Sequence, residues 1–360
     1  MSSIAIINGS PVNSGIYTSM RPYYRVLKHA GYDVEWYQCL DNKGQSGWME
    51  SEDKLIVGWN MPSESLRMGF NRFVTFPLKL RNVETETRFI TDPTMINAIA
   101  WNSKSIVFFH DVIPLTEFGR KISSRMMFKY AINRLDRVER IIVTTNHTME
   151  LLIDMKIDRK KISIIPYTTD FSLHEAHLEK SLSKLVNRKE LNVTYVAADR
   201  PHKCIDLFME VANAASTLTK DIRFNFHLVS RLRKSTAERL NRMHPANFFL
   251  HTDVKDMETI YELTDILIHT SLYEGFGLPI LEAMRFGIPI VARSSPSVTE
   301  LLDGNGIIIE SDRVDEWLSA LDSLKEADNY VRQSTASLKR SADFNVENFR
   351  AKVINIFGTL

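Results

Sequence analysis

Short apolar runs alternate with longer amphipathic segments along most of the 360-residue chain. Residues 4–7 and 105–109 have the apolar pattern of buried strands, and residues 18–30 have the periodicity of an amphipathic helix. This alternation predicts an α/β fold in which helices connect parallel strands. The predicted strands are residues 4–7, 34–37, 105–109, 141–143, 162–166, 192–197, 224–229, 248–251, 265–269, 288–292 and 306–309, whereas the pattern does not place residues 55–57.

The length favours two domains, because a single hydrophobic core stops growing at roughly 250–300 residues. Residues 171–190 are charged and only weakly periodic, so we expect a linker there. The composition, with 44% hydrophobic and 25% charged residues, is ordinary for a globular protein. The net charge of +1 argues against a general nucleic-acid binder.

Cysteine usage and the apolar runs predict a cytoplasmic protein. Cys39 and Cys204 are isolated, which fits reduced thiols better than a disulfide framework. The first eight residues lack the pattern of a signal peptide, and no apolar run approaches ~20 residues.

The most informative stretch is residues 270–293, which predicts a strand, a glycine loop, a helix and another strand. Two glycines around one aromatic residue favour a tight loop, Pro279 suits the first helical turn, and Gly287 suits the end of the helix. Seven residues separate the carboxylates of Glu274 and Glu282. Amides at the start of a helix attract phosphate and sugar oxygens. A sugar nucleotide would therefore place its sugar at Glu274, its phosphates over the loop amides and its ribose at Glu282.

This stretch resembles the E-x7-E element of retaining glycosyltransferases of family 4, which belong to the group 1 glycosyltransferases. The match covers Glu274-Gly275-Phe276-Gly277-Leu278-Pro279, Glu282-Ala283-Met284 and Gly287-Ile288-Pro289. The resemblance implies the GT-B architecture: two facing Rossmann-like domains, a deep cleft between them, and a C-terminal helix that crosses back to the first domain. We therefore expect an acceptor-side domain of residues 1–170 plus 345–360 and a nucleotide-sugar-binding domain of residues 191–344. The implied reaction is the retaining transfer of a hexose from a UDP- or GDP-sugar to a hydroxyl of a glycan or lipid-linked glycan.

The same resemblance assigns the donor site. Arg200 and Lys203 would grip the diphosphate and stabilise the charge that grows on it as the bond to the sugar breaks. The family usually has a glycine where this chain has Ala198 and a wider spacing between the two cations. Val254 would hold the base through its backbone, and Gly275, Phe276, Gly277 and Leu278 would line the loop. No D-x-D sequence occurs, so we expect neither a metal nor a cofactor.

On the acceptor side, residues 108–115 resemble the HD motif of these enzymes, with His110 near the transferred sugar. Asp111 would order the histidine or its loop. The loop after the first strand has no clean G-x-G-x-x-G pattern, and Gly15 is the glycine that matches the family's loop tip.

The sequence allows alternative interpretations of two segments and of the activity. Residues 66–80 fit either a surface for a lipid-linked acceptor or an anionic membrane, or core aromatics with solvated arginines. The basic residues 120–140 fit either a membrane-surface helix or a solvated helix of the domain. A nucleotide-sugar epimerase or a catalytically silent binding subunit remains possible as the alternative function.

Overall fold

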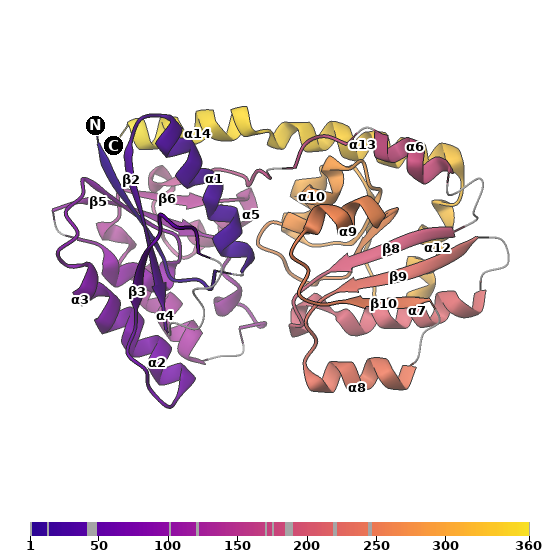
Figure 1. Cartoon of the computed structure of the whole chain (residues 1–360), viewed down its shortest axis with the longest axis horizontal. Helices are drawn as coiled ribbons and strands as arrows, with labels where there is room; N and C mark the ends of the chain where they lie inside the picture. Colours follow the sequence, from indigo (N-terminus) through magenta and orange to yellow (C-terminus); the bar gives the residue numbers. More distant parts are fainter. Residues whose placement is uncertain are drawn as a thin grey trace. The chain divides into compact units, whose positions relative to one another are not determined.

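The computed structural model describes residues 2–12, 14–41, 49–100, 102–119, 122–169, 171–174, 176–183, 190–218, 222–243 and 247–359. The chain divides into two compact units, Met1–Thr168 with Val346–Leu360, and Thr169–Asn345. Each unit contains one parallel sheet with helices on its faces (Figure 1). The predicted α/β fold with two parallel-sheet domains is confirmed.

The first unit contains a seven-stranded sheet in the order β3-β2-β1-β4-β5-β6-β7. Its strands are β1 (Ser3–Asn8), β2 (Asp33–Leu40), β3 (Lys54–Val57), β4 (Thr87–Ile90), β5 (Lys104–Phe109), β6 (Arg140–Val143) and β7 (Ile162–Ile164). Its α-helices are α1 (Gly15–His29), α2 (Glu64–Phe70), α3 (Phe76–Leu80), α4 (Ile122–Ile132), α5 (Asn146–Asp154) and α14 (Val346–Gly358). A π-helical turn, Asn71–Thr75, joins α2 to α3.

The C-terminal helix α14 belongs to the first unit and lies beside α1 (Figure 1). The ring of Tyr23 on α1 packs edge-on against Phe349 of α14, with 4.8 Å between ring centroids. Tyr23 also contacts Phe89 and Phe108 of the sheet. These rings are buried, so aromatic packing fixes the last helix on the sheet that begins the chain.

The second unit contains a six-stranded sheet in the order β10-β9-β8-β11-β12-β13. Its strands are β8 (Glu190–Val196), β9 (Arg223–Val229), β10 (Phe248–His251), β11 (Ile266–His269), β12 (Ile290–Arg293) and β13 (Ile307–Ile309). Its helices are α6 (Ala176–Ser183), α7 (Ile205–Leu218), α8 (Lys234–Met243), α9 (Met257–Leu263), α10 (Leu278–Arg285), α11 (Pro296–Leu302), α12 (Val314–Ser323) and α13 (Ala327–Ser341). Strand order reverses at β8 and β11, which is where α/β sheets bind ligands.

Residues 171–190 were expected to form a linker, but the described residues 176–183 form α6, and His174 and Ser181 pack into the second unit. The Ser181 hydroxyl donates a hydrogen bond to Asp265 Oδ1 at 2.8 Å. His174 stacks on Phe286 with 4.0 Å between ring centroids. Few apolar residues make these contacts, so the hydrophobic periodicity of the sequence gave only a weak signal for this helix. The unit boundaries lie after Thr168 and Asn345, close to the expected limits.

Strand β4 was not predicted, although it lies at the centre of the first sheet between β1 and β5. Only Phe89 and Ile90 are apolar in its four residues, and Arg88 occupies a buried position. The guanidinium of Arg88 donates to the backbone carbonyls of Ala98 and Leu80, and Val83 supplies a third acceptor. Tertiary contacts therefore place a charged residue where the pattern requires an apolar one.

Candidate active site

In the second unit, the carboxyl ends of β8 and β11 bring together the polar loops that follow them. These two strands are neighbours and run parallel, with Ile266 opposite Val193. The loop after β8 supplies Lys203, and the segment after β11 supplies Glu274. Because parallel strands end at one edge of the sheet, residues distant in sequence meet there.

The glycine loop and α10 form as the sequence predicts. Gly277 caps the helix with a φ of 101°, a conformation that favours glycine, and Pro279 lies in the first turn. Gly287 follows the helix with a φ of 66°. Its amide donates to the carbonyl of Met284 at 3.0 Å, and the next amide, of Ile288, donates to Ala283 at 3.2 Å. This pair of bonds is a Schellman motif, which ends the helix and fixes where β12 begins.

Glu274 lies in a buried cluster with two basic side chains. Its Oε1 lies 2.5 Å from Lys203 Nζ and 2.8 Å from His269 Nε2. Burial opposes ionisation of the carboxyl, but the charges and hydrogen bonds of Lys203 and His269 outweigh it and hold the pKa of Glu274 well below its ordinary value. The backbone carbonyl of Lys203 accepts hydrogen bonds from the hydroxyls of Tyr195 and Thr270. The loop that carries the lysine is therefore fixed to the sheet.

Glu282 lies in the second turn of α10 and contacts Tyr261 of α9. The Tyr261 hydroxyl donates to Glu282 Oε2 at 2.5 Å. Burial raises the pKa of Glu282 to about 7, although the hydrogen bond from Tyr261 lowers it. The two carboxylates of the E-x7-E element thus have opposite electrostatic environments: Glu274 is held ionised, whereas Glu282 titrates near neutrality.

Residues 190–326, which contain both carboxylates and Lys203, match the family model described as glycosyl transferases group 1. A glycosyltransferase from Haemophilus influenzae, described as uncharacterized, is 29% identical over 339 residues, covering 89% of this chain and 90% of that protein. The O-antigen chain mannosyltransferase B of Escherichia coli is 25% identical over 272 residues, covering 71% of each chain. The second unit therefore contains a group 1 glycosyltransferase domain, and the similarity to glycosyltransferases extends over most of the chain.

The fold of this glycosyltransferase is GT-B. Anabaena HepE, whose crystal structure contains UDP and glucose, matches it with a TM-score of 0.79 at 13% identity, over 100% of both chains. At that identity the likeness concerns the fold alone. The GT-B architecture implied by the E-x7-E resemblance is confirmed.

The other expected donor residues lie on neighbouring loops of the second unit of the transferase. Arg200 is exposed and precedes a short 3-10 turn, Pro201–Lys203. Val254 is half-buried and follows Asp253, whose φ is 54° and whose carboxylate pairs with Arg231. The structure thus brings Lys203 and Glu274 into direct contact and leaves the Arg200 side chain exposed.

His110 belongs to the first unit and lies at the end of β5. Its Nε2 is 2.7 Å from the carbonyl oxygen of Thr91, which only accepts, so this nitrogen carries the proton. Its Nδ1 then accepts a hydrogen bond from the Tyr167 hydroxyl. Burial lowers the pKa of His110 to about 4, so the ring is neutral at physiological pH. Asp111 accepts a hydrogen bond from the amide of Ile113 at 2.8 Å, which orders the loop after the strand.

Gly15 is the first residue of α1, where the expectation was a loop tip before a helix that begins near residue 18. Ser14 caps the helix through a hydrogen bond from the Tyr17 amide. A Cβ on Gly15 would meet no atom within 4 Å, whereas one on Gly9 would lie 2.9 Å from Met95 Cγ. The glycine that the packing requires in this loop is Gly9.

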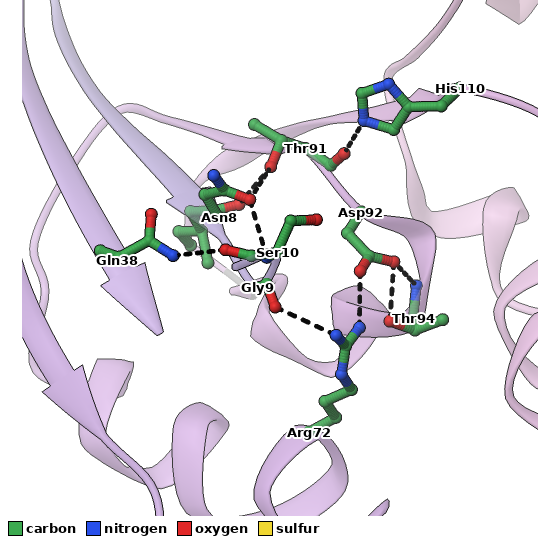
Figure 2. A network of polar contacts seen from close by, with 10 residues as sticks. Asn8, Gly9, Ser10, Gln38, Arg72, Thr91, Asp92, Thr94 and His110 are labelled. Atoms are coloured by element: carbon green, nitrogen blue, oxygen red, sulfur yellow. Dashed lines mark hydrogen bonds and ion pairs between the residues drawn. The ribbon is translucent and has the colours of Figure 1, made fainter. Parts of the chain in front are cut away.

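Sequence reasoning missed Arg72 and Asp92. These two residues join the π-helical turn, the segment after β4 and the loop after β1 (Figure 2). Arg72 donates to Asp92 Oδ2 at 2.6 Å and to the carbonyl of Gly9 at 3.0 Å. Asp92 also accepts from the amide and hydroxyl of Thr94. Since Asp92 follows the unpredicted strand β4, nothing in the sequence placed it beside the loop of Gly9. The π-helical turn that carries Arg72 is a feature frequent at functional sites.

The first unit's loop is held by further polar contacts (Figure 2). Asn8 Oδ1 accepts from the Ser10 amide at 2.9 Å and from the Thr91 hydroxyl at 3.1 Å. Gln38 Nε2 donates to the Ser10 carbonyl at 2.7 Å. Asn8, Ser10 and Gln38 are buried, so the loop after β1 is rigidly attached to β2 and β4.

No helix in the described ranges has the length and apolar character needed to cross a bilayer. Among the same residues, no group of three His, Cys, Asp or Glu side chains is placed to hold a metal ion.

Proposed function

We propose that this glycosyltransferase transfers a hexose, with retention of its anomeric configuration, from a UDP- or GDP-sugar to a hydroxyl group of a glycan or lipid-linked glycan. The observation that carries the proposal is the buried cluster of Lys203, Glu274 and His269 beside the start of α10. It combines a fixed cation for phosphate with a fixed carboxylate for sugar hydroxyls. No metal or cofactor has a role in the proposal.

In this reaction the acceptor oxygen forms a bond to the anomeric carbon on the face from which the diphosphate leaves. The bond between that carbon and the phosphate oxygen breaks, and the acceptor's proton moves to the departing phosphate. Lys203 and Arg200 stabilise the charge that develops there. Glu274 accepts hydrogen bonds from the sugar, and the amides of the Gly275 to Leu278 loop face the phosphates. Glu282 accepts from the ribose, and Val254 holds the base through its backbone.

The first unit serves the acceptor side in this proposal. His110 is neutral and doubly hydrogen-bonded, so it positions the sugar through its ring edge or backbone and does not act as a general base. A Cβ at Gly15 would meet no other atom, so we assign the contribution of Gly15 to its backbone amide at the start of α1.

The relatives rank the donors to be tested. O-antigen mannosyltransferases from Escherichia coli and Salmonella typhimurium favour a mannosyl donor, and the UDP in HepE makes UDP-glucose the second choice. O-antigen relatives also favour a bacterial polysaccharide acceptor. We propose a cytoplasmic location with peripheral contact at the membrane surface, where lipid-linked acceptors are presented.

Calorimetry with GDP, UDP and their hexose conjugates, with and without magnesium, tests the donor site. We expect one nucleotide to bind equally well with magnesium or with a chelator, and Lys203→Ala to weaken its binding at least about ten-fold, as expected for loss of a charged hydrogen bond. Arg313→Ala is the matched control, because Arg313 is an exposed cation whose partners are Asp315 and Glu316. Binding that requires magnesium, or that survives Lys203→Ala, would refute the assignment.

Product analysis tests the reaction itself. NMR of the product formed from an α-linked donor should show an α-linked sugar, and no sugar isomer should form without an acceptor. A β-linked product would refute retention. Conversion of the donor sugar without an acceptor would instead identify an epimerase, and tight binding without turnover over a broad acceptor panel would identify a silent binding subunit.

A further inference from the structure

We propose that one face of the first unit is a binding surface for acidic lipids, built from an exposed apolar row, a neighbouring pocket and a surround of cations. The inference rests on the proposed membrane-surface location and names the residues that produce it. The apolar row consists of Leu66, Phe70, Val74 and Leu78 on the run from α2 through the π-helical turn to α3, together with Trp59.

The apolar row faces solvent along one side of this helical run. Its four helical members are spaced four residues apart, so they recur about once per turn. Leu66 and Leu78 at the two ends are 65% and 61% exposed, and Trp59, 63% exposed, packs its ring against Phe70. Helix α4 contacts α2 and adds Ile122 and Met126, which are also largely exposed. Scattered apolar residues are normal on a surface, but a contiguous row of this kind marks an interaction site.

A pocket of about 440 Å³ opens beside the Val74 and Leu78 end of the row. Its walls are mainly apolar, and its polar lining residues are Arg81, Arg88 and Asn102. Its lining residues are Phe73, Val74, Pro77, Leu78, Arg81, Arg88, Ile99, Ala100 and Asn102. An apolar cavity with a few convergent polar groups is the usual form of a small-molecule site.

Arg88 indicates that the ligand is an anion. The side chain is only 3% exposed, and its hydrogen-bond acceptors are the carbonyls of Leu80, Val83 and Ala98. Its buried Nε has no acceptor, and in the described part of the chain no carboxylate pairs with it. A buried cation without an anionic partner is costly. An anionic group held by the exposed Arg81 at the pocket would reduce that cost.

The charges around the apolar row complete the argument. Residues 59–81 and α4 carry the cations Arg67, Arg72, Lys79, Arg81, Arg125 and Lys129, and Glu64 is their one acidic residue. Arg72 is neutralised by Asp92, whereas the other cations lie on the same helical segments as the apolar residues. An apolar stripe with basic residues and a tryptophan is the composition that binds the interface of an anionic bilayer. The occupant that fits all three features is a phospholipid with an anionic head and an acyl chain.

Co-flotation with vesicles tests this surface on the full-length protein. We expect binding to vesicles that contain phosphatidylglycerol and little binding to pure phosphatidylcholine, with a decrease as salt is raised. Arg81→Ala should weaken binding about five-fold, the effect of one cation near the surface. Leu78→Asp should weaken it at least about ten-fold by removing one inserted side chain. Arg313→Ala in the second unit has the same charge change as Arg81→Ala and should have no effect.

Donor calorimetry on the same variants separates this proposal from the proposed function. Leu78→Asp and Arg81→Ala should bind the nucleotide with unchanged affinity. Vesicle binding that ignores lipid charge, or that both variants retain, would overturn the lipid surface and leave the transferase proposal intact. A lipid-free dimer in solution that Leu78→Asp dissociates would also overturn it, because it would assign the surface to a second copy of the chain.

Discussion

Replacement of Lys203 by alanine is expected to destabilise the second unit and to slow glycosyl transfer. The ammonium group lies 2.5 Å from Glu274 Oε1, and the two side chains are 19% and 9% exposed. Removing one partner of a buried pair typically costs about 3–5 kcal/mol, because it leaves an uncompensated charge. His269 remains 2.8 Å from the carboxylate and Lys203 is partly exposed, so we expect the lower end, about 3 kcal/mol.

The pH dependence gives the same prediction a second signature. The pKa of folded Glu274 is depressed, so its contribution to stability is present above the unfolded pKa and is lost as pH falls through the lower folded pKa. The wild-type protein should therefore lose this contribution progressively as the pH falls from the unfolded pKa of Glu274 toward the lower folded pKa. In Lys203→Ala the folded pKa rises, and the variant should lose less stability than wild type when the pH is lowered.

Urea unfolding measured by circular dichroism, together with initial-rate kinetics, checks this prediction. The double variant Lys203→Ala/Glu274→Gln should recover part of the lost stability, because the stranded charge is also removed. Once the donor is identified, kcat/KM of Lys203→Ala should be roughly 10²–10³-fold below that of wild type, as for other groups that stabilise developing charge. An unchanged unfolding midpoint in Lys203→Ala, or no recovery in the double variant, would refute the reasoning about the buried pair.

Three further predictions follow from the same geometry. Burial raises the pKa of Glu282 from 4.5 to about 7, so its contribution to stability is complete below pH 4.5 and is lost as pH rises through 7. In Glu282→Gln this pH-dependent loss of unfolding free energy, up to about 3 kcal/mol, should be absent. Gly277→Ala should destabilise the protein by about 1–2 kcal/mol, because the φ of residue 277 is 101° and the new Cβ would lie 3.2 Å from Leu301. Gly15→Ala, in contrast, should unfold at an unchanged or higher urea concentration. Equal effects of the two substitutions would contradict this distinction between the two glycines. NMR of the His110 ring should show a neutral imidazole until the pH approaches 4, and a midpoint near 6.5 would mean that the ring is solvated.

The second half of the chain was the more predictable, because its signals are local. The glycine loop, α10 and the strands on either side depend on Gly277, Pro279 and Gly287, whose backbone preferences act within a few residues. The contact between Lys203 and Glu274 followed from topology, because the two segments leave neighbouring parallel strands. What no pattern predicted is His269, which ends β11 as the polar residue of an otherwise apolar strand and completes the cluster.

The first half was harder to predict because tertiary contacts decide its structure. Strand β4 has two apolar residues, and a buried arginine held by three carbonyls interrupts the pattern. Missing that strand also concealed Asp92, and therefore the contact by which Arg72 reaches the loop of Gly9. Gly9 was overlooked for a similar reason, since only the position of Met95 makes a side chain costly there, and the role of Gly15 stays a prediction.

The buried cluster also bears on how Glu274 would take part in the proposed retaining reaction. A carboxylate that attacks the anomeric carbon needs an available lone pair and a charge that is not already neutralised. In this protein Oε1 lies 2.5 Å from Lys203 Nζ and 2.8 Å from His269 Nε2, and these contacts hold the pKa of Glu274 low although burial opposes ionisation. Stabilisation of that kind lowers nucleophilicity while it fixes the direction in which the carboxylate accepts hydrogen bonds. An ammonium group has three donors, so Lys203 can keep its bond to Glu274 and still bind a phosphate oxygen. The geometry therefore favours Glu274 as the group that aligns the sugar and the lysine with each other, and it disfavours a covalent glycosyl-enzyme intermediate at this residue.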